Sequence, residues 1–208
     1  MRLVLASNNA KKLAELRVLF AALPIELVTQ GSLGVAEVEE PHHTFVENAL
    51  VKARHAAVAC GGAAIADDSG LCVDALGGAP GVASAHYATV ELPTVDREAQ
   101  RALQDVANNR LLLDRLQGHA DRHASFVSTL VALRHADDPQ PLIAFGRWSG
   151  EILDAPRGEG GFGYDPLMFI PTLGRSVAEL QADEKNRLSH RALAASDMLA
   201  LMRAHWLA

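Results

Sequence analysis

The stretch that most constrains the fold is a short apolar run, Ala63 to Ala66, which leads into Asp67-Asp68-Ser69-Gly70. A β-strand favours β-branched and apolar side chains, and Asp is depleted there. Two adjacent carboxylates at the end of such a strand therefore cost local stability unless a cation compensates them. A divalent metal with a phosphate-bearing substrate would supply that compensation. A plain surface loop is the alternative interpretation.

Length and composition limit the class of protein. With 208 residues, 49% of them apolar, the chain is expected to form one domain spanning residues 1–208. A formal charge of −6 disfavours nucleic-acid binding, RNA included, because that binding depends on clustered Lys and Arg. Cys60 and Cys72 form no CxxC pair, which is typical of a reducing compartment. Neither a signal segment nor an apolar run of ~20 residues is visible, so we expect a cytoplasmic protein with no membrane partner.

Periodicity predicts alternating strands and helices in the first part of the chain and a β-hairpin in the middle. The predicted strands are 3–6, 25–28, 63–66, 125–133 and 142–152, and the predicted helices follow Ser7-Asn8-Asn9, begin at Thr44, and cover 97–116 and 189–206. Thr44 with Glu47 matches a capping box. Leu103, Val106 and Leu111 are among the apolar positions of the third helix. The pattern indicates a mixed-sheet α/β fold.

The segment Ser7 to Lys12 lies at a strand-to-helix junction. Free backbone N–H groups and the positive end of the helix dipole favour anions at such a junction. Lys12 could reach a phosphate, whereas ordinary helix capping with solvated lysines is the alternative. The chain contains no Walker A motif, so a phosphate bound here would not be held as in a P-loop protein.

An acidic cluster, Glu37, Glu39 and Glu40, precedes the capped helix. On its own this cluster is typical of a solvated loop. Together with Asp67 and Asp68 it could complete a Mg²⁺ site, because Mg²⁺ takes only one or two protein carboxylates besides substrate phosphates.

Residues 158–163 formally match G-x-G-x-x-G. A dinucleotide site needs a helix directly afterwards, but Tyr164-Asp165-Pro166 follows, so we reject the Rossmann interpretation. The loop could instead present Phe162, Tyr164 and Asp165 for stacking on and hydrogen bonding to a planar base. Residues 183–191 add several cations around the start of the last helix, where Ser189 capping a solvated helix is the alternative.

These motifs follow one another in a characteristic order. The chain closely resembles the inosine triphosphate pyrophosphatase family from the first strand to the last helix, through Ser7-x-Asn9-x-x-Lys12, Thr44-Phe45-x-Glu47-Asn48-Ala49, Ala66-Asp67-Asp68-Ser69-Gly70-Leu71, Leu76-Gly77-Gly78-Ala79-Pro80-Gly81, Gly161-Phe162-Gly163-Tyr164-Asp165-Pro166 and Ser189-His190-Arg191. The Asp-Asp-Ser-Gly and Phe-Gly-Tyr-Asp blocks are the most specific parts of this match.

The resemblance implies an elongated mixed β-sheet flanked by helices, with two lobes and a substrate cleft between them. It also implies a homodimer that cleanses the nucleotide pool by hydrolysing ITP, dITP and XTP to the monophosphate and pyrophosphate. One Mg²⁺ per subunit is implied, with Mn²⁺ as the alternative ion. Asp68 would be the general base and a metal ligand, with Glu39 the second ligand and Glu40 the alternative. Substrate contacts would come from Ser7, Asn8, Asn9, Ala10, Lys11, Lys12, Ser69, Phe162, Gly163, Tyr164, Asp165, Lys185, His190 and Arg191.

Two other functions compete with this one. A pyrophosphatase of related fold could act on modified pyrimidine or methylated nucleotides, and a catalytically silent module could sense purine triphosphates. Asp68 and the acidic cluster favour catalysis, because a binding module needs no base beside a metal. Base selection is expected to depend on the 6-keto acceptor of hypoxanthine and xanthine. A buried donor, which Arg191 could supply, would be left unpaired against adenine, and mispairing of this kind can give ~10⁴-fold selectivity.

Overall fold

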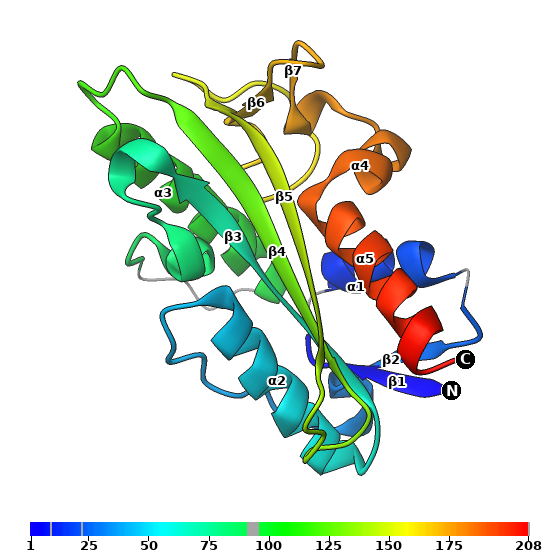
Figure 1. Ribbon diagram of the computed structural model, residues 1–208. Helices are drawn as coiled ribbons and strands as arrows, with labels where there is room; N and C mark the ends of the chain where they lie inside the picture. The colour runs from blue at the N-terminus through cyan, green and yellow to red at the C-terminus, as the bar shows by residue number, and fades with distance from the viewer. Residues whose placement is uncertain (9, 22, 91–95, 208) are drawn as a thin grey trace. The chain divides into compact units, whose positions relative to one another are not determined.

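The computed structural model describes the chain except residues 9, 22, 91–95 and 208 (Figure 1). In the described part, seven strands form one sheet in the order β2-β1-β3-β4-β5-β6-β7, flanked by helices, so the predicted mixed α/β class is confirmed. The strands are β1 (Arg2–Leu5), β2 (Glu26–Thr29), β3 (Ala64–Val73), β4 (His123–Leu133), β5 (Leu142–Ile152), β6 (Met168–Ile170) and β7 (Arg175–Ser176). The α-helices are α1 (Ala10–Phe20), α2 (Phe45–Cys60), α3 (Arg97–Arg115), α4 (Ala182–Leu188) and α5 (His190–His205), and the 3₁₀ helices are η1 (Gly31–Leu33), η2 (Asp74–Leu76), η3 (Gly81–His86) and η4 (Val177–Glu179).

The chain divides into two compact units. Unit 1 comprises Met1–Ser69, Ser128–Arg147 and Leu188–Ala208, and unit 2 comprises Gly70–Val127 and Trp148–Arg187. Strands β3, β4 and β5 each contribute residues to both units.

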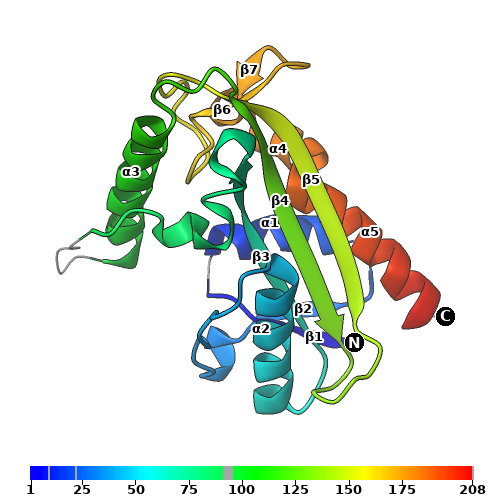
Figure 2. The ribbon, with the colours of Figure 1, turned by 60° about the vertical axis from the view of Figure 1, so that its left-hand side comes forward.

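In unit 1 the sheet is covered by helices on both faces (Figures 1 and 2). Successive side chains of a strand point to opposite faces. Leu3 and Leu5 of β1 accordingly pack in the cluster that contains α1 and α5 residues, whereas Val4 and Ala6 pack in the cluster of α2. Strand β1 pairs in parallel with β2 and with β3. Burial on both faces explains why β1 is a continuous apolar run after Arg2.

Unit 2 has its own core, in which Leu71 and Val73 of β3 pack with Leu112 and Leu116. Strands β5, β6 and β7 pair antiparallel in succession. Helix α3 runs as predicted, but Leu103 and Val106 are 45% and 69% exposed. These two residues therefore contribute little to the core, which is formed by positions closer to the end of the helix.

The predicted strand 63–66 is too short, because β3 continues through both carboxylates to Val73. The cations described below compensate the two acids, so the strand need not end at Asp67. A separate short helix, α4, precedes the last predicted helix and ends at Leu188. Ser189 then caps α5 by accepting the N–H of Ala192.

The start of α5 packs unusually close to β5 at Gly146. A Cβ built on Gly146 would lie 1.8 Å from the carbonyl oxygen of His190 and 2.6 Å from the backbone nitrogen of Ala194. Both neighbours are helix backbone, so neither can move aside as the end of a side chain would.

We therefore expect Gly146→Ala to lower the free energy of unfolding by at least about 1–3 kcal/mol, because overpacking displaces the helix. Gly62→Ala is the matched control, since its Cβ would meet no atom within 4 Å. Urea denaturation of both variants checks this. Equal stabilities would show that α5 tolerates displacement from the sheet.

The connection between β4 and β5 is held by the buried carboxylate of Asp138. It accepts the backbone N–H groups of Arg134 and Gln140, both at 3.0 Å, and the Arg134 Nε–H at 3.1 Å. The hydrogen bond from the Arg134 side chain, with those from the backbone, outweighs burial and lowers the pKa of Asp138 below its usual range.

A carboxylate with a depressed pKa stabilises the fold above its unfolded pKa, and this contribution is lost as the pH falls. We expect Asp138→Asn to cost about 1.5–3 kcal/mol at pH 7, since it loses charge-assisted hydrogen bonds. The deficit should shrink below about pH 4. The exposed neighbour provides the control Asp137→Asn, and denaturation from pH 7 to 3 measures both. A deficit that is independent of pH would contradict an ionic role.

Candidate active site

Strand β3 carries Asp67 and Asp68 at consecutive positions, so the two carboxylates point to opposite faces of the sheet. Asp67 lies on the face covered by α1 and α5, where it contacts Lys12 and Arg191. Asp68 lies on the face covered by α2, where it contacts Lys52. The two acids thus have different cationic partners, since those of Asp67 come from α1 and α5 and that of Asp68 comes from α2.

Asp67 is the centre of a buried polar network. Lys12 Nζ lies 2.8 Å from Asp67 Oδ2, and the hydroxyl of Ser128 on β4 donates to Oδ1 at 2.7 Å. The Ser69 hydroxyl donates to the same Oδ1, and Arg191 Nε approaches Oδ2 at 3.4 Å. Burial alone would raise the pKa of Asp67, but Lys12 and Arg191 outweigh it and hold the pKa well below its usual range. Asp67 is therefore a permanent anion.

Arg191 is buried as well and is paired on two sides. Its guanidinium contacts Asp67 and also Glu15 of α1, and Nη2 lies 3.5 Å from the Ser69 hydroxyl. A guanidinium has five N–H donors, so it can keep these partners and still donate to a ligand.

The surroundings of Asp68 are different. Its Oδ1 accepts a hydrogen bond from Lys52 Nζ at 2.8 Å, and the same Nζ lies 2.7 Å from Glu40 Oε2. Among the described residues the other oxygen, Oδ2, is buried and has no hydrogen-bond partner. Burial raises the pKa of Asp68 to about 6, although Lys52 and Lys12 act against the rise. A carboxylate with an unpaired oxygen and a pKa near neutrality is suited to accept a proton.

Lys52 stays charged between the two acids. Burial would lower its pKa, but Asp68 and Glu40 more than compensate and raise it. Glu40 thus lies beside Asp68 through a shared lysine, and Glu39 is exposed at the neighbouring position. Within the described residues, no group of three or more His, Cys, Asp or Glu could hold a metal ion.

The segment Ser7 to Lys12 connects β1 to α1 as predicted. Asn9 lies outside the described residues, and Lys12 directs its charge to Asp67. Gly31 allows the Asn8 side chain to lie close, since a Cβ at position 31 would be 2.4 Å from Asn8 Oδ1.

A second cluster forms in unit 2 around the loop Phe162 to Asp165. Lys185 Nζ lies 2.6 Å from Asp165 Oδ2 and 4.4 Å from the centre of the Phe162 ring. The backbone N–H of Phe162 donates to Asp165 Oδ2 at 2.9 Å. Gly161 is required here, because its φ is +75° and a Cβ would lie 2.1 Å from that oxygen.

We expected this loop to present Tyr164 for stacking on a base, and for the ring of Tyr164 this expectation is wrong. The Tyr164 side chain is buried in the core of unit 2, and its hydroxyl donates to the carbonyl of Ser84 at 2.9 Å. Burial raises the pKa of Tyr164 above its usual value. A ligand contact from Tyr164 would therefore involve its backbone, and Phe162 is the aromatic ring of this loop suited to stacking.

Those predicted site residues whose contacts are described above thus form two clusters, one in each unit. Ser69, His190 and Arg191 belong to unit 1 with the carboxylate pair, whereas Lys185 belongs to unit 2 with the Phe162 loop. Sequence reasoning missed Glu15 and Ser128, which are ordinary helix and strand residues by pattern.

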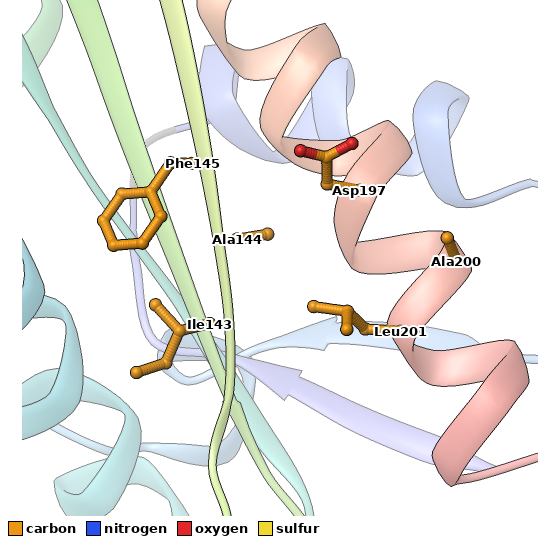
Figure 3. Close-up of a pocket in the computed structure, with 6 residues that line it drawn as sticks. All are labelled: Ile143, Ala144, Phe145, Asp197, Ala200 and Leu201. Carbon is orange, nitrogen blue, oxygen red and sulfur yellow. The ribbon is translucent and has the colours of Figure 1, made fainter.

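A shallow apolar hollow of about 360 Å³ in unit 1 is a separate feature (Figure 3). It lies between β5 and α5, and Asp197 is its ionisable residue. Because it contains none of the predicted site residues, it is not the candidate active site.

No helix of the described chain has the length and apolar character needed to cross a membrane.

Comparisons with known proteins agree with this geometry. The sequence profile of the Ham1 family matches residues 3–201, so the chain belongs to the Ham1 family. The dITP/XTP pyrophosphatase of Methylibium petroleiphilum is 86% identical over 208 residues, covering both chains completely, and that of Leptothrix cholodnii is 68% identical over 99% of each. A HAM1 protein structure from Coxiella burnetii superposes with a TM-score of 0.88 at 41% identity, covering 98% of this chain and 99% of that one.

The network predicts unequal roles in stability for the two acids. Asp67→Asn leaves the buried Arg191 and the partly buried Lys12 beside a neutral amide, so we expect a loss of about 3–5 kcal/mol in unfolding free energy. Asp68→Asn is the matched control, and it should cost much less, because Lys52 retains Glu40 and burial already disfavours the Asp68 charge. Denaturant unfolding at pH 7 measures both. Equal losses would remove Asp67 from its structural role.

Proposed function

We propose that the chain hydrolyses the non-standard purine triphosphates ITP, dITP and XTP to the monophosphate and pyrophosphate. The observation that carries the proposal is the carboxylate of Asp68, in which one oxygen contacts Lys52 and the other is buried with no hydrogen-bond partner in the described part of the chain. The relatives named dITP/XTP pyrophosphatase support the substrate class. A silent sensor of nucleotides would have no use for a buried base held in this way.

In the proposed reaction, the carboxylate of Asp68 accepts a proton from the attacking water. The oxygen of that water forms a bond to the α-phosphorus, the bond from this phosphorus to the bridging oxygen breaks, and pyrophosphate leaves. Lys52 and Lys12 lie on either face of β3 and would oppose the negative charge of the phosphates. The backbone of the Ser7 to Lys12 segment, at the start of α1, would hold a phosphate group.

The residues present fit a Mg²⁺ ion. The unpaired oxygen of Asp68 and a glutamate of the adjacent pair, Glu39 or Glu40, are hard oxygen ligands of the kind that Mg²⁺ takes together with phosphates. When bound, such an ion supplies Lewis-acid stabilisation of the charge on the leaving pyrophosphate. Mn²⁺ has the same ligand preference.

For base recognition we assign Phe162 to stacking and Arg191 to the 6-keto group. Asp165, Lys185 and His190 complete the proposed nucleotide site, and Ser69 contacts substrate beside Arg191. We further propose, on family resemblance, a cytoplasmic homodimer.

The substrate class is tested by measuring pyrophosphate released from ITP, XTP, ATP and GTP in the presence of Mg²⁺. We expect release from ITP and XTP at rates far above those from ATP and GTP. Equal rates on all four would refute the specificity, and orthophosphate as the first product would refute the assignment of the bond.

The role of Asp68 is tested by Asp68→Asn, which keeps the shape of the side chain and removes the base. Loss of a positioned general base typically costs 10²–10⁴-fold in rate. We expect kcat on ITP to fall by about that factor, while nucleotide binding, measured by calorimetry, is retained. Asp137→Asn, an exposed carboxylate in the connection between β4 and β5, is the control. Full activity of Asp68→Asn would exclude Asp68 from the mechanism.

A further inference from the structure

Helix α3 holds the Phe162 loop by both backbone groups of Gly163. Asp105 Oδ2 accepts the Gly163 N–H at 2.8 Å, and Asn109 Nδ2 donates to the Gly163 carbonyl at 3.0 Å. The two side chains stand four residues apart and so share one face of the helix. They reach 58 and 54 positions along the chain to the loop, so these contacts are tertiary and not part of a local turn.

Gly163 is a flexible point of the loop, where such support restricts the backbone. Its φ is +61°, a conformation that glycine adopts readily in an unfolded chain along with many others. Its neighbour Phe162 has its N–H held by Asp165, so the contacts from α3 fix the peptide groups on the other side of the ring.

The helix is itself anchored by its adjacent polar residues. Gln104 donates to the carbonyl of Ala88 at 2.7 Å, and Asn108 accepts the Ala88 N–H at 2.8 Å and donates to the carbonyl of Ser84 at 3.2 Å. Tyr164 donates to that same Ser84 carbonyl. Consecutive loop residues, Gly163 and Tyr164, are therefore tied to α3 directly and through Ser84.

We propose that Asp105 and Asn109 are positioning residues for base recognition, which hold Gly163 so that the Phe162 ring is ordered before a nucleotide binds. This inference rests on the proposed function in one respect, the contact of the Phe162 loop with the purine. Neither side chain takes part in the chemical step. Their loss should weaken binding of the base and leave turnover of bound substrate nearly unchanged.

The chemistry of the pair makes the role specific. Position 105 must accept a hydrogen bond, and an amide oxygen can do so, so Asp105→Asn should preserve the contact. Position 109 must donate, and Asn109→Asp places a carboxylate against a carbonyl oxygen. Two isosteric exchanges therefore have opposite expected outcomes.

The test measures kcat and KM for ITP in Asp105→Asn, Asp105→Ala, Asn109→Asp and Asn109→Ala. Loss of one hydrogen bond corresponds to about 3- to 10-fold in affinity. We expect KM to rise by about that factor in every variant except Asp105→Asn. The kcat of each variant should stay within about twofold of the unaltered chain, because the contact stabilises the bound substrate and the transition state equally. Val106→Ala, exposed on the same helix, is the control and should match the unaltered chain. The inhibition constant of tripolyphosphate, which has no base, should stay unchanged in every variant.

Thermal unfolding identifies any variant that fails to fold, and the alanine exchange at the same position then replaces it. The inference is overturned if the folded Asn109 variants keep the KM of the unaltered chain, if kcat falls instead of KM rising, or if Asp105→Asn is as impaired as Asp105→Ala. A failure of the proposed function looks different, because the unaltered chain would then release no pyrophosphate from ITP.

Discussion

The ion pairing of Asp67 is the constraint on which the rest of unit 1 depends. A buried carboxylate in the middle of a strand is costly, and it is tolerated because Lys12, Arg191 and two hydroxyls surround it. Apart from Ser69, which lies on the same strand, these partners come from α1, α5 and β4, so a single charge fixes elements that are distant in the sequence. Arg191 is held further by Glu15. The candidate site of unit 1 is therefore assembled around the buried anion of Asp67.

The neighbouring carboxylate is placed in a contrasting environment. Asp68 has one cation on one oxygen, and burial raises its pKa, whereas the cations around Asp67 lower the pKa of that group. The alternation of side chains along β3 separates the two environments by the thickness of a sheet. Two identical residues, adjacent in sequence, can thus serve as a structural anion and as the proposed base, which is the usual way in which one site obtains two protonation behaviours.

The class of fold could be predicted from the sequence, because the spacing of apolar residues in segments such as Leu3 to Ala6 and Ser189 to Trp206 is typical of a strand or a helix. The predicted end of β3 was wrong, because strand propensity disfavours Asp. The cations that stabilise Asp67 and Asp68 within the strand come from three other segments of the chain. The prediction for the Tyr164 ring was also wrong, because a pattern cannot tell a loop aromatic that stacks on a ligand from one that fills a core. Ser128, Glu15, Asp105 and Asn109 carried no signal, as their partners lie far along the chain. The motif blocks and their resemblance to a family led to the candidate site residues, and the structure shows which of the described ones contact each other within each unit.

In the proposed reaction, the point of attack by water is the α-phosphorus. It is tested most directly by a single turnover of ITP in water enriched with heavy oxygen, followed by mass spectrometry of both products. We expect one heavy oxygen in the phosphate of the nucleoside monophosphate and none in pyrophosphate. Heavy oxygen in pyrophosphate, with an unlabelled monophosphate, would place the attack on the β-phosphorus and contradict the account.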